Sequence, residues 1–184
     1  MLWCIKTGKV GKKKMTTHFN IEPNWNIDEY KSLNFKLDKH KNDVDNQHYI
    51  DAGHPKDALT LYNYFEPNPM PASIDYVVAQ FTHLENISVA VNLMKPGQYL
   101  PIHIDLYGAY KSYHNLPENI GICRYLVMLE DSQPGQMLYV NDLVYNKWRA
   151  GGVFGWRNND VHTFYNLSTE NRYAVQITGT YSHR

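Results

Sequence analysis

The chain has little cysteine and no long apolar run. Its 184 residues include only two cysteines, Cys4 and Cys123. Two cysteines this far apart exclude a disulfide scaffold and a CxxC site, and they favour reduced thiols in a cytosol-like compartment. The absence of any run of about 18 apolar residues excludes a transmembrane helix. The N-terminus also lacks the apolar segment of a signal peptide, so we expect a soluble, cytoplasmic protein that does not bind membranes.

Net charge is absent as well, because 18 Lys and Arg residues balance 18 Asp and Glu residues. Residues 1–14 contain five lysines and no acid, which leaves the remainder with 13 basic and 18 acidic residues, a net charge of −5. An acidic body disfavours nucleic acid as a partner, because phosphate binding depends on clustered Lys and Arg. We predict a basic N-terminal extension over residues 1–17, either solvated or in contact with a polyanion, and a single domain over residues 18–184.

The first part of this domain, residues 18–85, is expected to be irregular and helical. Apolar positions over residues 56–65 are spaced for one helix face, and three prolines follow. Ser73 is a candidate helix N-cap, and the apolar residues after it recur at helical spacing as far as Phe81. We therefore predict two short helices that pack on a core.

From about residue 86 the apolar pattern changes to a period of two, which indicates β-strands. The candidate strands are residues 87–94, 99–105, 122–129, 137–145, 152–156, 162–166 and 172–181. Residues of turn type, such as Pro96-Gly97 and Asn158-Asn159, separate them. Many short strands joined by turns predict a mainly β, antiparallel sandwich or barrel over residues 86–184, with a jelly roll as the leading case and the helices flanking one sheet.

Three residues in this pattern have the chemistry of a metal site. In a strand, residues i and i+2 point to the same face, so His103 and Asp105 can reach one cation together. His162 begins a later strand and supplies a third ligand. Two histidines and one carboxylate are the facial triad of non-haem Fe(II) enzymes, and the absence of thiolate favours iron over zinc or copper. Taken alone, a His-x-Asp pair is more often structural.

Arg172 strengthens the functional interpretation. It follows His162 by ten residues and begins the next predicted strand. If residues 167–171 form a tight hairpin turn, Arg172 lies beside His162 on the neighbouring strand. A guanidinium there can hold a carboxylate in bidentate fashion. The alternative is an ordinary arginine on a strand surface.

These residues together resemble the Fe(II)/2-oxoglutarate-dependent dioxygenase superfamily. The stretch MKPGQYLPIHID, residues 94–105, is similar to the motif around the first two ligands of prolyl 4-hydroxylase-type enzymes. The later part is similar to aspartyl/asparaginyl β-hydroxylase-type domains. The matching features are Arg124, the hairpin at residues 135–140, the Trp-x-x-Gly step at 148–151, the His-x-x-x-Asn segment at 162–166, and Arg172. That second branch often lacks the carboxylate ligand, whereas Asp105 is present here, so the resemblance does not single out one branch.

The resemblance implies a double-stranded β-helix, a jelly roll of cupin-like type, in a dioxygenase domain. It implies Fe(II) held by His103, Asp105 and His162, and 2-oxoglutarate bound to the iron with its far carboxylate on Arg172. Dioxygen is then the second cosubstrate. The implied reaction hydroxylates an unactivated C–H bond of a peptide or protein side chain, or of an amino-acid-like small molecule, and releases succinate and CO2.

Other residues are secondary candidates for the pocket. Arg124 either reaches the 2-oxoglutarate or a substrate carboxylate, or pairs with Glu130 or Asp131. Tyr99 lies four residues before His103, so strand alternation places it on the same face, as a cosubstrate contact or as a core aromatic. The remaining candidates are Asn92, Asn166 and Gln176, because polar side chains in apolar strands need partners.

Two other functions fit the same predicted fold, because a fold does not determine a function. One is a catalytically idle, cupin-like jelly roll that acts as a binding or structural module. The other is a metal-dependent hydrolase or isomerase. The complete set of three ligands and Arg172 favours the dioxygenase, since an idle module has no need of all four residues.

Overall fold

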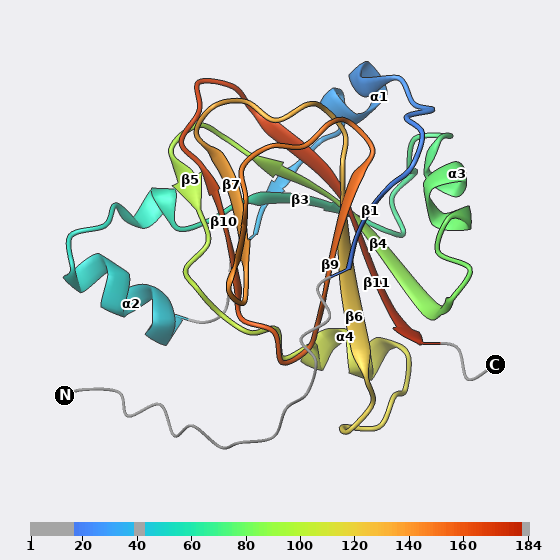
Figure 1. Ribbon diagram of the computed structural model, residues 1–184. Helices are drawn as coiled ribbons and strands as arrows, with labels where there is room; N and C mark the ends of the chain where they lie inside the picture. The colour runs from blue at the N-terminus through green and yellow to red at the C-terminus, as the bar shows by residue number, and fades with distance from the viewer. Residues whose placement is uncertain (1–16, 39–42, 182–184) are drawn as a thin grey trace.

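The computed structural model describes residues 17–38 and 43–181, and they form two antiparallel sheets packed face to face (Figure 1). The predicted basic extension lies outside the described residues, except for Thr17. The mainly β jelly roll with flanking helices is confirmed. Among the described helices, none has the length and apolar character needed to cross a membrane.

The larger sheet has seven strands in the order β1-β9-β6-β11-β4-β3-β2. Their bounds are Thr17–Asn20 (β1), Gly152–Arg157 (β9), Ile122–Met128 (β6), Arg172–Tyr181 (β11), Leu84–Met94 (β4), Tyr62–Phe65 (β3) and Lys36–Leu37 (β2). The long strands β4 and β11 pair along nearly their whole length and form the centre of the sheet. Strands β1, β2 and β3 come from the part of the chain expected to be irregular and helical.

The smaller sheet has four strands in the order β5-β10-β7-β8. They are Gln98–Tyr99 (β5), His162–Asn166 (β10), Gln136–Val140 (β7) and Leu143–Tyr145 (β8). The predicted strand over residues 137–145 is thus a hairpin, because Asn141 adopts a positive φ of 54° and turns the chain between β7 and β8. The predicted strand over residues 99–105 is regular only at its start.

In the part of the chain that the structure describes, four short α-helices flank the sheets: Ile27–Lys31 (α1), Asp43–Asp51 (α2), Ile74–Ala79 (α3) and Gly108–Tyr113 (α4). Figure 1 shows α3 against the outer face of the large sheet and α2 beside the small sheet. The predicted helix after Ser73 is confirmed as α3, although the Ser73 hydroxyl bonds to the Tyr30 hydroxyl instead of capping the helix. The predicted helix over residues 56–65 is wrong. Only Lys56–Ala58 forms a 3-10 turn (η1), and the rest leads into β3, which pairs with β4.

Strand alternation divides the apolar side chains of the large sheet between two cores. On β11, Val175 and Ile177 face outward and pack with Val77 and Phe81 near α3. Ala174 faces the small sheet, and the inner core there includes Leu138, Phe154 and Phe164. Even-numbered residues of β11 therefore point into the space between the sheets, and this decides which side chains reach the candidate site.

Substitution of Leu138 tests the assigned inner core, because this side chain is fully buried. Leu167, which is 63% exposed, is the matched control. Leu138→Ala is expected to lower the free energy of unfolding by about 2–5 kcal/mol, because it leaves a cavity between the sheets. The matched Leu167→Ala change should alter it by no more than about 0.5 kcal/mol. Urea unfolding followed by circular dichroism measures both, and equal effects of the two variants would contradict the assigned core.

Candidate metal and anion site

A cavity of about 230 Å³ lies between the two sheets. Its walls come from the inner face of the large sheet, from β10, and from the segment that leads from β5 to α4. Of the residues predicted for the site, His103, Asp105, Arg124, His162 and Arg172 all line this cavity. The structure thus brings together these five and two of the secondary candidates, Asn92 and Gln176, although they come from distant parts of the sequence.

The two histidines are fixed side by side by their backbones. His103 N–H donates to the His162 carbonyl at 3.0 Å, and His162 N–H donates to the His103 carbonyl at 2.9 Å. Each ring also donates from Nδ1 to a carbonyl two residues earlier, that of Pro101 at 2.7 Å for His103 and that of Asp160 at 3.0 Å for His162. This second set of bonds leaves Nε2 of both rings as the lone-pair nitrogen, which is the state that binds a metal.

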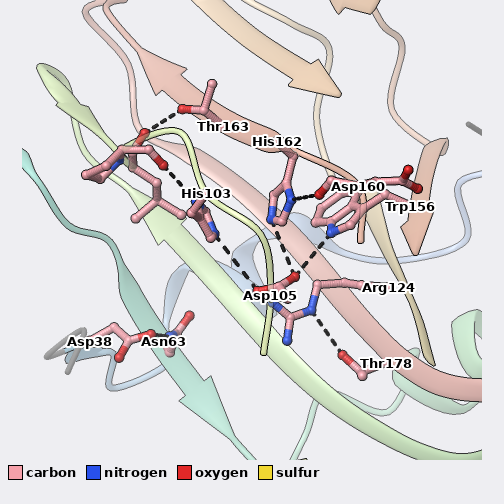
Figure 2. Close-up of polar contacts among 12 residues, drawn as sticks. Asp38, Asn63, His103, Asp105, Arg124, Trp156, Asp160, His162, Thr163 and Thr178 are labelled. Atoms are coloured by element: carbon pink, nitrogen blue, oxygen red, sulfur yellow. Dashed lines mark hydrogen bonds and ion pairs between the residues drawn. The ribbon is translucent and has the colours of Figure 1, made fainter. Parts of the chain in front are cut away.

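Asp105 completes a group of three ligand atoms that lie within 4.8 Å of one another. Its Oδ2 is 3.4 Å from His162 Nε2, and its Oδ1 is 3.9 Å from His103 Nε2 (Figure 2). Metal–ligand bonds of about 2.1 Å at right angles place neighbouring ligand atoms about 3 Å apart. The observed separations therefore suit one metal ion with three protein ligands.

Arg124 and Trp156 hold the Asp105 carboxylate from the large sheet. The two residues are directly opposite each other on β6 and β9. Arg124 Nη1 donates to Asp105 Oδ1 at 2.9 Å, and Trp156 Nε1 donates to Oδ2 at 3.2 Å. Arg124 Nε also donates to Thr178 Oγ1 at 3.2 Å, across the strand pair on the other side. A row of three cross-strand neighbours thus orients the carboxylate.

Neither partner expected for Arg124 on the protein itself is found. Glu130 pairs with Lys31, and Asp131 pairs with Arg149. The reason is distance along the strand, since Arg124 lies near the start of β6, whereas Glu130 and Asp131 follow its end.

The charges in the site depend on one another. Burial raises the pKa of Asp105, but Arg124 and the two histidines outweigh this effect and the net pKa lies well below the usual range. Burial lowers the pKa of His162 to about 4, although Asp105 opposes the shift. The site at neutral pH therefore offers an ionised carboxylate and an unprotonated His162, which is the protonation state that metal binding requires.

Arg172 reaches the cavity by a different route from the one predicted. A hairpin would have placed it beside His162, but β10 belongs to the small sheet and β11 to the large one. Residues 167–171 therefore cross between the sheets. Arg172 enters the cavity from the sheet opposite His162, and its Cζ lies 3.2 Å from the centre of the Phe164 ring on β10.

The Arg172 guanidinium is buried without a counter-charge among the described residues. Its Nε and Nη1 have no hydrogen-bond partner, and the residue is 5% exposed. Burial lowers its pKa well below the usual value. Because an isolated buried charge is costly, such an arginine marks a place where an anion is expected to bind.

Tyr99 does not line the cavity, contrary to the expectation from strand alternation. It is paired with Tyr165, its ring stacks on the Tyr165 ring at 5.8 Å, and its hydroxyl bonds to His54 Nδ1. Regular strand pairing ends at Tyr99, so strand alternation does not place the Tyr99 side chain on the same face as His103. Asn166 is likewise absent from the cavity, because its side chain bonds to the Met94 carbonyl and to the turn that follows.

Three cavity residues with polar side-chain groups were not predicted from the sequence: Trp156, Asn63 and Asp38. Trp156 was detectable in principle, since it alternates with the buried Phe154 on a predicted strand. Asn63 and Asp38 were not, because they reach the cavity through the pairing of β2 with β3 and of β3 with β4, which no local pattern indicates.

A second hollow, about 810 Å³ in volume, lies on the other side of Arg172. Its lining is mostly charged and polar, with Lys31, Glu130 and Glu170 among its residues. None of the three candidate metal ligands lines it. We therefore assign the chemistry to the smaller cavity.

Comparison with known proteins shows similarity at the level of the fold. No family model matches the chain, and no curated protein does. A prolyl-4-hydroxylase from Pseudomonas putida is 12% identical, with a TM-score of 0.50 over 85% of this chain and 97% of that one. A collagen prolyl hydroxylase from Paramecium Bursaria Chlorella virus-1, in complex with 2OG, is 13% identical, with a TM-score of 0.44 over 82% of this chain and 98% of that one. The Cnp3 cupin domain of Schizosaccharomyces pombe is 12% identical, with a TM-score of 0.41 over 92% and 88%.

The ion pair between Arg124 and Asp105 is expected to stabilise the metal-free protein. Arg124→Met is expected to lower the free energy of unfolding by about 3–5 kcal/mol at pH 7, because it leaves a buried carboxylate without its partner. Because folding lowers the pKa of Asp105, the pair's contribution is present at neutral pH and is lost as the solution becomes strongly acidic. Urea unfolding measures the effect.

The control is the double variant Arg124→Met with Asp105→Asn, which removes both charges. It should be more stable than the sum of the two single changes predicts. Additive effects would show that the two residues are not coupled and would contradict the assigned pair.

Proposed function

We propose that this protein is an Fe(II)- and 2-oxoglutarate-dependent dioxygenase. Its reaction is the hydroxylation of an unactivated C–H bond of a peptide or protein side chain, or of an amino-acid-like small molecule, with release of succinate and CO2. One observation carries the proposal: the candidate metal ligands and a buried arginine without an anion line the same cavity.

The donor set fits iron. His103, Asp105 and His162 supply two imidazole nitrogens and one carboxylate from one side of the cavity, with no thiolate. A metal held in this way keeps open positions for other ligands, as in non-haem Fe(II) oxygenases. When bound, Fe(II) together with 2-oxoglutarate and dioxygen supplies the oxidising chemistry.

Arg172 fits the far carboxylate of 2-oxoglutarate. A dicarboxylate with one end at the metal ligands needs a cation at its other end, and the unpartnered Nε and Nη1 of Arg172 are donors suited to a bidentate carboxylate. Phe164 stacks against the guanidinium and excludes water from one side of it. The far carboxylate of 2-oxoglutarate would therefore supply the negative charge that pairs with Arg172.

The other residues of the cavity position these groups. The carbonyls of Pro101 and Asp160 fix the histidine rings, and Arg124 and Trp156 fix the Asp105 carboxylate. Such outer contacts keep ligands oriented before the metal arrives. A catalytically idle binding module would not need a pre-oriented set of ligands together with a buried, unpaired arginine.

Anaerobic titration tests the proposal. Addition of Fe(II) and then 2-oxoglutarate to the wild-type protein is expected to give a visible metal-to-ligand charge-transfer band. His103→Ala, Asp105→Ala and His162→Ala should each lose this band, because each removes one of three ligands. In a separate assay with dioxygen present they should also lose succinate formation. His54→Ala serves as a matched control, since His54 does not line the cavity.

Three results would count against the dioxygenase. Absence of the band in the wild type would favour an idle jelly roll. Turnover without dioxygen or 2-oxoglutarate would favour a hydrolase or isomerase. Full succinate production by the three ligand variants would show that the metal ligands are wrongly assigned.

A further inference from the structure

Tyr107 comes directly before α4 in a backbone conformation that is unusual for a tyrosine. Its φ of 56° and ψ of 23° lie in the left-handed region, which is costly for a residue with a side chain. The next residue, Gly108, would take this conformation freely. Strained residues of this kind cluster at functional sites, and Tyr107 lies two residues after the candidate metal ligand Asp105.

The side chain of Tyr107 carries a second cost. It is 7% exposed, and its hydroxyl is buried without a hydrogen-bond partner among the described residues. Burial raises the pKa of Tyr107 well above its usual value, and the charges of Arg124 and Asp105 act on it in opposite directions. The hydroxyl therefore keeps its proton and is a donor without an acceptor. A buried polar group in this state destabilises the fold unless another state of the protein gives it a partner.

Tyr107 lies against the group that holds Asp105. Its ring faces the Arg124 guanidinium, whose Cζ is 4.8 Å from the centre of the ring. Arg124 in turn donates to Asp105 Oδ1. The negative charge of Asp105 is near enough to act on Tyr107 as well. Tyr107 is thus in contact with the arginine that orients a candidate metal ligand, and its hydroxyl is buried close to that ligand.

The rest of α4 fixes the position of Tyr107. The Tyr110 hydroxyl donates to the Asn86 carbonyl at 2.6 Å, and the Ser88 hydroxyl is hydrogen-bonded to His114 Nε2 at 2.8 Å. Both contacts join the helix to β4. In Figure 1, α4 lies at the lower end of the large sheet, next to β6. Because these bonds hold the helix on the sheet, they also keep the Tyr107 hydroxyl near the site.

The Asp105 carboxylate has room for one more donor. Its two oxygens offer about four lone-pair positions. Arg124 and Trp156 occupy two of them, and a metal ion on the three candidate ligands would take a third. The carboxylate is 3.4 and 3.9 Å from the two histidine nitrogens, farther than the about 3 Å expected for ligands of one metal. These groups therefore have to draw together when a metal binds, and the fourth position remains for a donor from the protein.

We propose that Tyr107 is a positioning residue of the metal site, and that its hydroxyl donates a hydrogen bond to the Asp105 carboxylate in the metal-bound protein. The inference rests on the proposed function, because it concerns the same metal site. Hydrogen bonds of this kind orient ligating carboxylates, and the loss of one typically lowers metal affinity about 10- to 100-fold. The strained backbone at Tyr107 then serves to direct the hydroxyl toward the ligand.

The variant Tyr107→Phe removes only the hydroxyl and keeps the ring on Arg124. It is expected to raise the melting temperature of the metal-free protein by about 2–4 °C, because it removes a buried hydroxyl without a partner. It is also expected to weaken Fe(II) binding about tenfold, measured anaerobically by isothermal titration calorimetry of the full chain. A tyrosine with a purely structural role would not lower the Fe(II) affinity of a protein that has become more stable.

Tyr110→Phe is the matched control. Tyr110 lies on the same helix, but its hydroxyl donates to the Asn86 carbonyl, and neither residue lines the cavity. This variant loses a hydrogen bond that is already made, so it should not raise the melting temperature. Its affinity for Fe(II) should equal that of the wild type.

The outcomes distinguish this inference from the proposed function. Equal Fe(II) affinity of Tyr107→Phe and the wild type would overturn the inference, and the dioxygenase would stand if 2-oxoglutarate gives the charge-transfer band. An equal loss of affinity in Tyr110→Phe would also overturn it. So would a lower melting temperature of metal-free Tyr107→Phe, because the hydroxyl would then be engaged before the metal binds. If only Tyr107→Phe weakens Fe(II) binding and the wild type gives no band, the role of Tyr107 is supported and the dioxygenase is not.

Discussion

Arg172 places a positive charge between two sheets, where the described residues provide no carboxylate to pair with it. Removing an ion from water costs several kcal/mol unless a partner compensates. Its surroundings are largely apolar, with Met94 opposite Arg172 on β4. The Phe164 ring against its guanidinium is a cation–π contact, which offsets part of this cost. Arg172 therefore needs an anion, and it lines the same cavity as the three candidate metal ligands. This shared cavity is the link between the fold and the proposed chemistry.

The two sheets supply different groups to the site. The small sheet and the segment after β5 supply His103 and His162, whose backbones bond to each other directly. The large sheet supplies the charged and polar groups around them: Arg124 beside Asp105, Arg172 at the anion position and Asp38 at the edge. Arg124 and Arg172 lie on strands, and side chains on strands hold the Asp105 carboxylate, which favours a site formed before any ligand binds.

Part of the site was predictable from the sequence because it depends on local spacing. The i, i+2 spacing of His103 and Asp105 predicted that they reach one cation together, although only His103, in an isolated bridge, pairs as in a strand. The turn before His162 marked the strand that carries it. The position of Arg172 was harder, because five residues between two strands suit a hairpin and a crossover equally well. Tyr99 was misplaced where regular pairing stops. Asp38 and Asn63 depend on pairing between distant segments, which has no local signature.

In the proposed function, Arg172 binds the far carboxylate of 2-oxoglutarate. The most direct test compares anaerobic binding of 2-oxoglutarate and 2-oxopentanoate, which lacks that carboxylate, to the Fe(II)-loaded protein. The wild type should bind 2-oxoglutarate about 10- to 100-fold more tightly, and Arg172→Ala should lose this preference while its Fe(II) affinity is unchanged. Arg149→Ala, at an arginine side chain 87% exposed, should behave as the wild type. Equal binding of the two acids by the wild type, or an undiminished preference in Arg172→Ala, would contradict the claim.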